Sequence, residues 1–387
     1  MKAVILAAGE GTRLHPLTQT RPKSMLPIGD RPLLEHIVDA VTAAGIDELL
    51  FVVGYKRERI QNYFGNGERW DASIEYVTQE NPRGTGHALL TAEPAISGDC
   101  LVINGDRIVE PELLRRLLNR HADTNGACLA ITEVTDPTQY GSVEVHDGLI
   151  NNIREKPAPH EVTSNLINTG VYVFGPDIFA AIRQTEHHAE LKLTDTLRNY
   201  IDEHPLHAVH YDGLWLELSR PWDLLAVNNG ILATQGSTVA DSAVIHDDAT
   251  IGDPVVIGDH SRIQPGARIF HDVVIGDNVT IGANTILTNS VILEDTVIKP
   301  GTVLTDCIIG SGTELGPLNS IEGGSSDVRV DDQIYPNVKF GGLIGDNVRT
   351  GGHVTVEPGS IISNGVTVES GATLTDRISE DVHVVRG

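Results

Sequence analysis

The chain has 387 residues, which is enough for two or three domains with buried cores. It carries 28 lysines and arginines against 53 aspartates and glutamates, a formal net charge of −25. Nucleic-acid grooves and anionic membrane surfaces are bound by basic patches, so this balance argues against both kinds of partner. Many carboxylates with only seven lysines favour a halophile, whose salt-rich cytosol screens acidic self-repulsion. An ordinary acidic protein is the alternative.

The three cysteines, Cys100, Cys128 and Cys307, are too few and too scattered for a disulfide framework or a zinc knuckle. We expect buried thiols in a reducing compartment. No apolar run approaches the length of a membrane span. The apolar stretch before Glu10 is short, and we interpret it as a buried strand running into a loop rather than as a signal peptide. The predicted location is therefore the cytoplasm.

Residues 1–232 alternate short apolar runs with helical patterns. Strands are expected at Val4–Ala8, Leu49–Val53, Cys100–Asn104 and Ala127–Ile131, with helices such as Leu33–Ala44 and Pro111–Arg120 between them. This alternation predicts an α/β domain with a Rossmann-like, mixed but mostly parallel sheet. Ligands of such sheets bind at the carboxyl ends of the strands, so the residues after each strand are the first candidates for chemistry.

Residues 240–380 repeat with a period of six. An aliphatic residue recurs at Ile245, Ile251, Ile257, Ile263, Ile269, Ile275, Ile281, Leu287 and Leu293, and a small or β-branched residue follows four positions after each. Neither a helix nor a flat strand has this period, whereas a parallel β-helix of short strands and sharp turns does. The period is lost across Glu322–Phe340, where we expect an extruded loop, and it resumes at Ile344.

The segment Gly9-Glu10-Gly11-Thr12-Arg13 follows the first expected strand. A dinucleotide fingerprint would need a third glycine where Leu14 stands, and no Gly-Lys-Ser/Thr ends the segment as in a P-loop. A glycine turn nevertheless exposes backbone N–H groups to anionic oxygens. Arg13 and Lys23 add two cations in an otherwise acidic chain, which favours a phosphate site.

The run Leu6–Leu14, with Pro22-Lys23 after it, resembles the signature of the sugar-1-phosphate nucleotidylyltransferases. The hexads resemble the left-handed β-helices, whose members are usually homotrimers. Together they are similar to the archaeal, N-acetylglucosamine-1-phosphate uridylyltransferase-like branch. The resemblance implies in-line, Mg²⁺-dependent attack of a sugar-1-phosphate on the α-phosphorus of a nucleoside triphosphate. It assigns nucleotide binding to Leu6, Ala8, Gly9, Gly11 and Thr12, and catalytic charge neutralisation to Arg13 and Lys23.

Two carboxylates are the candidate Mg²⁺ ligands. Asp106 ends a strand run and matches the family's Gly-Asp ligand. At the second position the resemblance implies Asp, with Gly two residues later, but this chain has Glu217 and Ser219. Glutamate also coordinates Mg²⁺, so we retain it as a ligand. Arg107 offers Asp106 an ion pair that would compete with a metal.

The resemblance places base recognition at Gln79, Gly84 and Thr85, and favours UTP over dTTP. His87 is interpreted as a helix-start residue because the chemistry needs no base. Sugar-phosphate recognition maps to Gly141, Glu155, Lys156 and Asn168. Thr194 or Asp195 is expected to be a helix N-cap.

Three alternatives remain beside a UDP-glucose- or UDP-N-acetylglucosamine-forming enzyme. A thymidylyltransferase is one, and a catalytically silent sugar-nucleotide-binding homologue is another. The third adds acetyl-CoA-dependent acetyl transfer to glucosamine-1-phosphate on the β-helix, but Pro300 and Val303 stand where relatives have His and Tyr. His246, His260 and His271 fall at different phases of the hexad, which argues against a three-histidine zinc site.

Overall fold

The computed structural model describes residues 1–186, 190–331 and 333–386. The chain divides into two compact units. Unit 1 contains Met1–Glu10, Pro22–Met25 and Leu33–Glu217, and unit 2 contains Gly11–Arg21, Leu26–Pro32 and the chain from Leu218 onward. Two short N-terminal segments are therefore grouped with the C-terminal half of the chain.

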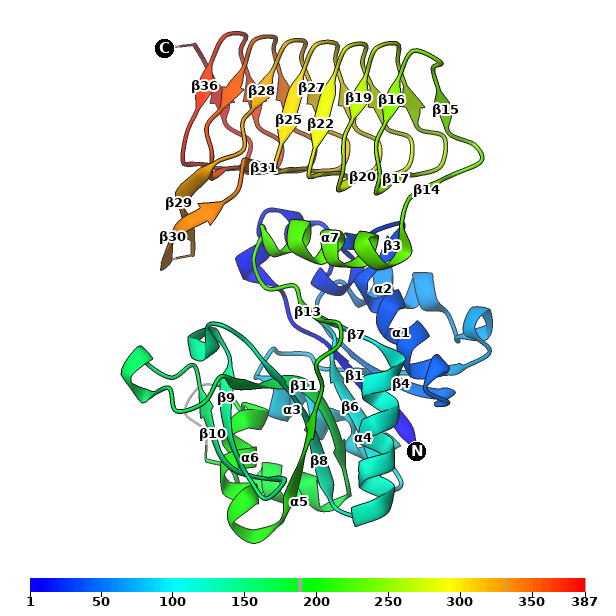
Figure 1. Cartoon of the computed structure of the whole chain (residues 1–387), viewed down its shortest axis with the longest axis vertical. Coiled ribbons are helices and arrows are strands. Elements are labelled where there is room, and N and C mark those ends of the chain that lie inside the picture. The colour runs from blue at the N-terminus through cyan, green and yellow to red at the C-terminus, as the bar shows by residue number, and fades with distance from the viewer. Residues whose placement is uncertain (187–189, 332, 387) are drawn as a thin grey trace. The chain divides into compact units, whose positions relative to one another are not determined.

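Unit 1 is built on a mixed sheet in the order β5-β4-β1-β6-β11-β8-β12-β10-β9. Its strands are β1 (Lys2–Ala7), β4 (Glu48–Val53), β5 (Ser73–Thr78), β6 (Cys100–Asn104), β8 (Ala127–Glu133), β9 (Gly141–His146), β10 (Leu149–Glu155), β11 (Leu166–Phe174) and β12 (Leu206–His210). Strands β5, β4, β1 and β6 are parallel, and β11 runs antiparallel between β6 and β8. The expected α/β fold class with a mixed sheet is confirmed (Figure 1). The sheet is not mostly parallel, however, because β10 also pairs antiparallel with β9 and β12.

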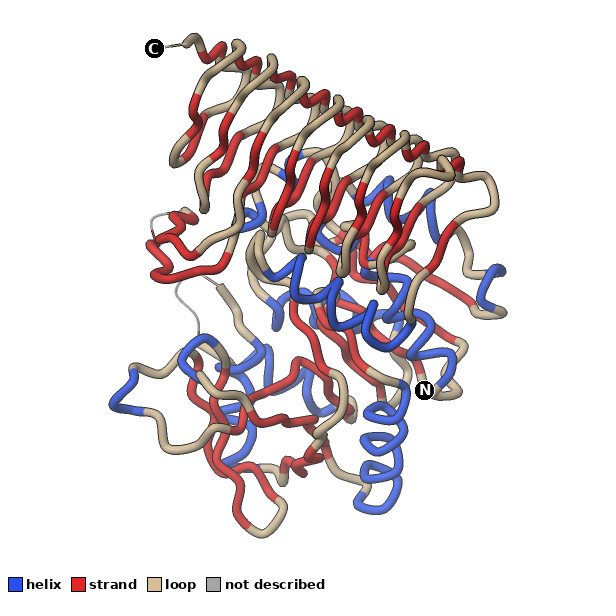
Figure 2. The backbone as a smooth tube through the Cα atoms, turned by 45° about the horizontal axis from the view of Figure 1, so that its top comes forward, coloured by secondary structure: helices blue, strands red, loops and turns tan. Residues whose placement is uncertain are grey.

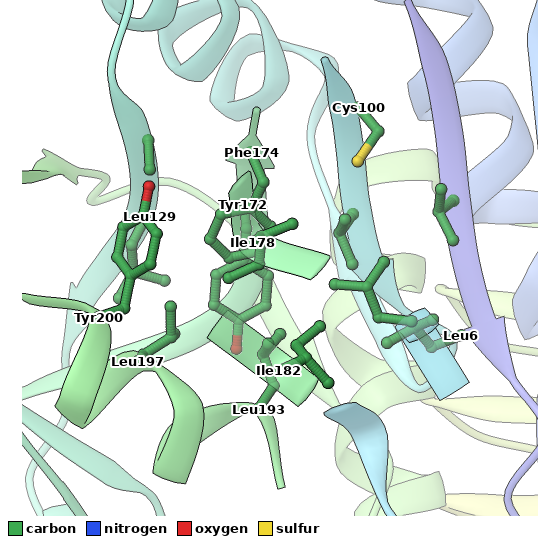
Figure 3. Packing of buried hydrophobic residues seen from close by; sticks show 14 of the residues in the cluster. Leu6, Cys100, Leu129, Tyr172, Phe174, Ile178, Ile182, Leu193, Leu197 and Tyr200 are labelled. Carbon is green, nitrogen blue, oxygen red and sulfur yellow. The ribbon is translucent and has the colours of Figure 1, made fainter. Parts of the chain in front are cut away.

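Helices cover both faces of this sheet. They are α1 (Leu33–Ala43), α2 (Arg57–Phe64), α3 (Thr85–Ala92), α4 (Pro111–Thr124), α5 (Asp177–Gln184) and α6 (Leu193–Glu203). Every residue of β1 after Lys2 is at least nine-tenths buried, because side chains on both faces of the strand meet apolar neighbours. On one face Val4 and Leu6 belong to a cluster with residues of α3, α5 and α6 (Figure 3).

The three cysteines are free and buried, as expected. Burial raises the pKa of Cys100 and Cys307 to about 12 and that of Cys128 to about 11. Among the residues that the structure describes, no helix is both long and apolar enough to cross a membrane.

The expected N-cap of α6 is wrong. The helix begins at Leu193, so Thr194 and Asp195 lie inside its first turn and Lys192 is the N-cap residue. The Leu193 N–H instead donates to Thr85 Oγ1 at 3.0 Å. The hydroxyl that satisfies this helix end therefore comes from a residue more than a hundred positions away in the chain.

Unit 2 is dominated by a left-handed parallel β-helix with three sheets, one along each face of the coil (Figure 2). The first contains β14 (Thr238–Val239), β17 (Val255–Ile257), β20 (Val273–Ile275), β23 (Ser290–Ile292), β26 (Cys307–Ile309), β31 (Gly342–Ile344), β34 (Ser360–Ile362) and β37 (Arg377–Ile378). The second contains β15 (Val244–Ile245), β18 (Arg262–Ile263), β21 (Thr280–Ile281), β24 (Val297–Ile298), β27 (Glu314–Leu315), β32 (Arg349–Thr350), β35 (Thr367–Val368) and β38 (His383–Val384). The third contains β16 (Thr250–Ile251), β19 (Arg268–Ile269), β22 (Ile286–Thr288), β25 (Val303–Thr305), β28 (Ser320–Ile321), β33 (Thr355–Val356) and β36 (Thr373–Leu374).

The inward aliphatic column follows the predicted hexads up to Leu287 and then shifts by one residue. Ile263 pairs with Ile281, eighteen positions later, whereas Ile275 pairs with Ile292, only seventeen positions later. The prediction that Leu293 belongs to this column is therefore wrong, and Ile292 takes the place in the core. The turn at Asn289 is one residue shorter than those before it, and Asn289 adopts the left-handed conformation that a tight turn requires.

The interruption of the repeat is a β-hairpin rather than an irregular loop. Strands β29 (Ser325–Val330) and β30 (Gln333–Lys339) pair antiparallel. The ring of Tyr335 lies 5.3 Å from that of Trp222, just before α7 (Asp223–Gln235), and the guanidinium of Arg220 lies 4.3 Å from the Tyr335 ring centre. Aromatic and cation–π contacts therefore hold the hairpin against the start of α7. Short strands β2 (Pro27–Ile28) and β3 (Arg31–Pro32) also belong to this unit.

Candidate active site

Glycines allow the strand ends of unit 1 to approach one another closely. The Gly105 N–H, directly after β6, donates to the Leu6 carbonyl at 2.9 Å. A Cβ on Gly105 would lie 2.7 Å from that carbonyl oxygen, and one on Gly54 would lie 2.8 Å from the Ala8 oxygen. Larger residues would force these chain segments apart. Leu6 and Ala8 are thus fixed at the carboxyl ends of β4 and β6, the edge at which ligands bind in such sheets.

Lys23 and Asp106 meet at this edge. Lys23 begins the 3-10 helix η3 (Lys23–Met25), and its Nζ lies 2.7 Å from Asp106 Oδ2. The side chains are 14% and 25% exposed, so the pair is largely shielded yet open on one side. The structure therefore brings together the expected cation and the expected carboxylate across 83 positions of sequence.

Arg107 lies between the two candidate metal ligands. Antiparallel pairing of β7 (Arg107–Val109) with β13 (Trp215–Glu217) places Arg107 opposite Glu217. One guanidinium nitrogen of Arg107 is 2.7 Å from Glu217 Oε1 and 3.2 Å from Asp106 Oδ1. The sequence predicts an ion pair between Arg107 and Asp106 that would compete with a metal. This ion pair is present, and Arg107 also pairs with Glu217.

The environment of Arg107 fixes its position and charge. Its Nε donates to the Thr169 carbonyl at 3.1 Å, and the Trp215 ring centre lies 5.4 Å from its guanidinium carbon. Burial disfavours the charged form, but Asp106 and Glu217 outweigh burial and raise the pKa of Arg107 above its ordinary value. Arg107 therefore remains a cation locked between two carboxylates.

The donor atoms here suit Mg²⁺. Asp106 and Glu217 supply hard carboxylate oxygens, and the Oδ1 atom of Asn104, at the end of β6, is buried without a hydrogen-bond partner among the described residues. No group of three or more histidine, cysteine or acidic side chains suited to a metal occurs within the described ranges. Mg²⁺ commonly takes only one or two protein carboxylates and completes its shell with water and substrate phosphate. The residues therefore fit a metal shared with a bound triphosphate.

The loop before α3 is clamped by unusual backbone geometry. Gly84 has φ +94°, and a Cβ there would lie 2.6 Å from the Leu191 carbonyl oxygen. The Gly86 N–H donates to the same oxygen at 2.8 Å, while Leu191 N–H donates to the Arg83 carbonyl at 2.7 Å. Thr85, expected at the nucleotide, uses its hydroxyl to cap α6.

His87 orients the side chain of Gln79. The Nε2 atom of Gln79 lies 2.8 Å from His87 Nδ1 and 3.3 Å from the Gly84 carbonyl oxygen. An amide NH₂ group is only a donor, so Nδ1 of His87 accepts in this arrangement. Both contacts engage the nitrogen end of the amide and leave its carbonyl end for another donor. His87 is therefore more than a helix-start residue, because it fixes which end of Gln79 is presented.

Three of the residues expected to bind sugar converge. A Cβ on Gly141 would lie 3.3 Å from Glu155 Oε2 and 3.6 Å from Asn168 Cβ. The Asn168 amide is oriented internally, donating to Tyr172 Oη at 2.7 Å and accepting from Gly170 N–H at 2.8 Å. Lys156 follows β10 in the left-handed conformation, and its N–H donates to the Tyr140 carbonyl at 2.8 Å.

The glycine turn continues into the other unit. Gly9 lies in unit 1, where a Cβ would meet nothing within 4 Å, while Gly11, Thr12 and Arg13 lie in unit 2. Gly11 is left-handed, with φ +68°, and precedes the 3-10 helix η1 (Thr12–Leu14). Its carbonyl accepts the Thr18 hydroxyl at 2.8 Å, which closes this segment on itself.

Comparison with known proteins agrees with this geometry. The nucleotidyl transferase family matches residues 2–234, which include every candidate residue described above. The chain belongs to the nucleotidyl transferase family. Residues 251–340 match a second family, described as the GMPPB C-terminal domain.

Named relatives share mainly the first part of the chain. The bifunctional protein GlmU of Methanococcus maripaludis strain S2 is 40% identical over 235 residues, covering 60% of this chain and 54% of the relative. This chain thus spans about half the length of the GlmU relatives that it matches. The UTP–glucose-1-phosphate uridylyltransferase AglF of Haloferax volcanii is 35% identical, over 58% of this chain and 93% of AglF.

A solved structure has the same nucleotidyl transferase fold. UDP-glucose pyrophosphorylase complexed with UDP-glucose superposes with a TM-score of 0.57 at 27% sequence identity, covering 60% of this chain and 99% of that one. A putative glucose-1-phosphate thymidylyltransferase from Bacillus anthracis gives a TM-score of 0.56 at the same identity.

Sequence analysis missed two features of this candidate site. The contact of His87 with Gln79 joins residues eight positions apart, and no local pattern marks it. Trp215 has no role in the sequence analysis, yet its ring lies against the Arg107 guanidinium and its indole N–H donates to the same Thr169 carbonyl at 2.9 Å. The Trp-x-Glu spacing could have indicated this role for Trp215, because alternate residues of a strand lie on one face and Trp215 is therefore on the same face as Glu217.

Proposed function

We propose that this chain is a sugar-1-phosphate nucleotidylyltransferase that forms a nucleoside diphosphate sugar and pyrophosphate. UTP is the proposed donor, and glucose-1-phosphate or N-acetylglucosamine-1-phosphate the proposed acceptor. Residues 1–232 would form the catalytic domain and residues 240–380 the β-helix. The observation that carries the proposal is the Lys23–Asp106 contact of 2.7 Å at the carboxyl ends of the strands, within a nucleotidyl transferase family match.

The chemistry asks for charge neutralisation rather than a strong base. An oxygen of the sugar phosphate attacks the α-phosphorus of the triphosphate, a new P–O bond forms, and the bond to the β-phosphate oxygen breaks. The nucleophile is already ionised, and pyrophosphate leaves with the negative charge. Lys23 and Arg13 would neutralise the phosphates, and the backbone N–H groups around Gly9, Gly11 and Thr12 would bind their oxygens. Mg²⁺, when bound, would supply further charge neutralisation, with Asp106 and Glu217 as its protein ligands.

The oriented Gln79 amide supports a uracil or thymine base. Its side-chain carbonyl, which neither the His87 nor the Gly84 contact uses, suits the N3–H donor that both bases carry, whereas cytosine presents an acceptor at N3. Gly84 lets the backbone approach the ring. AglF is a UTP–glucose-1-phosphate uridylyltransferase by name, and this chain matches 93% of it, which favours UTP. The thymidylyltransferase among the structural neighbours keeps dTTP as the alternative.

The convergence of Gly141, Glu155 and Asn168 supports a sugar subsite. The Glu155 carboxylate would accept from sugar hydroxyls, and the neighbouring Lys156 would contact the sugar phosphate. Glucose and N-acetylglucosamine differ at one ring substituent, so the same three residues serve either sugar.

A nucleotide-by-sugar panel tests the proposal. Pyrophosphate release is measured with UTP or dTTP, each with glucose-1-phosphate or N-acetylglucosamine-1-phosphate, in Mg²⁺ and high salt. We expect release with UTP, and loss of most turnover in a folded Lys23→Ala variant. No release in any combination would favour the silent sugar-nucleotide-binding homologue, for which the Arg107 ion pairs with both carboxylates are the supporting observation.

The β-helix is proposed to be structural and to join three chains in the cytoplasm. An additional acetyltransferase activity of the β-helix is supported by one observation, which is that the GlmU relatives are named bifunctional proteins. Against it, Pro300 and Val303 lack the side chains that the acetyltransferase resemblance requires. Thiol release from acetyl-CoA with glucosamine-1-phosphate would establish the second activity.

A further inference from the structure

The segment Gly11–Arg21, which directly follows the glycine turn, packs with the β-helix in one compact unit. Leu14, Leu17 and Thr18 are fully buried. The Asn364 amide, in a β-helix turn, donates to the Pro16 carbonyl at 3.3 Å and to Gln19 Oε1 at 3.0 Å. This segment is therefore held by residues about 350 positions away in the chain.

A buried ion pair fixes the end of the segment. Arg21 donates from one terminal nitrogen to Asp346 Oδ2 at 3.0 Å and to Ser311 Oγ at 2.8 Å. The Thr20 hydroxyl donates to the same Asp346 oxygen. Arg21 also lies 3.4 Å from Glu294 Oε1, but the Glu294 side chain is 42% exposed, whereas Arg21 and Asp346 are only 6% and 3% exposed. Asp346 is therefore the buried partner of Arg21, and removing its charge would leave the buried guanidinium with a solvent-screened carboxylate alone.

The charge of Asp346 is not needed for the turn in which it lies. Its Oδ1 accepts the Ser311 N–H at 2.8 Å, and the equivalent turn one coil later uses an uncharged residue, Asn364, whose Oδ1 accepts the Asp346 N–H at 2.7 Å. Three coils earlier, Asp277 performs the same task for the Asp259 N–H at 2.7 Å. An amide therefore suffices for the turn, and the second oxygen of Asp346 with its negative charge serves Arg21.

We propose that the β-helix is a positioning element for the phosphate-binding segment, and that the Arg21–Asp346 ion pair is its principal contact. The segment contains Gly11, Thr12 and Arg13, to which the proposed function assigns phosphate binding. The inference rests on the proposed function in one respect, which is that the ligand of this segment is a nucleoside triphosphate.

The sharpest test is Asp346→Asn, which keeps the turn acceptor and removes the charge. Amide hydrogen exchange of the full-length protein, without nucleotide, is followed in peptides covering residues 11–21. We expect faster exchange in Asp346→Asn and in Arg21→Met, and unchanged exchange in the matched control Asp277→Asn. Wild-type exchange in both the Asp346 and Arg21 variants would overturn the proposal.

Kinetics give the second readout. In Asp346→Asn we expect the KM for UTP to rise about tenfold or more, with a smaller change in kcat, because a misplaced loop weakens binding before chemistry. A KM equal to that of Asp277→Asn would overturn the proposal. If the wild-type protein turns over no substrate, the proposed function fails, yet the exchange experiment still decides whether the β-helix holds the segment.

Discussion

At the scale of single residues, charge compensation organises the site. Lys23 and Arg107 face Asp106 and Glu217, so two cations and two carboxylates balance in a partly buried place. Such a balance matters because an unpaired charge removed from water is costly. Each member therefore stabilises the others before any ligand arrives.

Removing Arg107 should make stability depend on a divalent cation. In Arg107→Met, Asp106 and Glu217 lose a shared cation, and we expect the free energy of unfolding to fall by about 3 kcal/mol in EDTA. Mg²⁺ should restore part of the loss, and denaturant unfolding with and without the metal measures it. Arg116→Met is the control, since that exposed arginine pairs with exposed Glu112 and should cost under about 1 kcal/mol. An equal loss in both variants, or no effect of Mg²⁺, would contradict the expectation.

Removing the His87 acceptor should relax base selection. In His87→Leu the Gln79 amide is free to turn and present its NH₂ to the acceptor N3 of cytosine, so we expect the preference of kcat/KM for UTP over CTP to fall about tenfold. His87→Asn, which offers an acceptor near the Nδ1 position, should recover most of the preference. The idea is wrong if both variants discriminate as well as the wild type.

At the scale of elements, turns and strand ends decide where functional groups lie. Strands β1, β4, β6 and β8 could be predicted from apolar runs, because each of these runs is buried on both faces. Strands such as β5 and β10 mix exposed and buried residues and were not predicted. Helix α6 shows the limit of such local patterns. Its start is satisfied by Thr85 from a distant loop, and a side chain arriving from elsewhere leaves no mark in the sequence around Leu193.

The loop before α3 should tolerate no side chain at Gly84. Gly84→Ala combines a strained φ of +94° with a Cβ 2.6 Å from the Leu191 carbonyl oxygen, so the loop must move away from Leu191. We expect the KM for UTP to rise about tenfold or more and the melting temperature to fall. Gly98→Ala, where a Cβ meets nothing within 4 Å, should change neither quantity. If the two variants have the same KM for UTP and the same melting temperature, the loop before α3 is not part of the UTP site.

At the scale of the whole molecule, a net charge of −25 sets the conditions for stability. Like charges repel across a folded surface, and salt screens that repulsion within a Debye length of about 10 Å at 0.1 M. We expect the melting temperature to rise by at least a few degrees between 0.1 and about 2 M KCl. An uncharged osmolyte of equal osmolality is the control and should raise it less. A melting temperature that falls with KCl would show that attractive ion pairs dominate.

The sequence by itself determined the two-part architecture, because apolar alternation and a six-residue period are local patterns. It also predicted the residues of the candidate site, since Lys23, Asp106 and Glu217 stand in recognisable motifs, and the structure places their side chains in one ion-pair cluster. The register of the β-helix beyond Asn289 depended on the length of one turn, which shifts every later residue without changing the composition. Only the tertiary structure decided that Arg107 lies between two carboxylates, that His87 orients Gln79, and that Asp346 holds Arg21. Strand pairing and the stacking of coils bring these residues together. The backbone fold therefore determines which groups a charged side chain meets, and the residues next to it in the sequence do not.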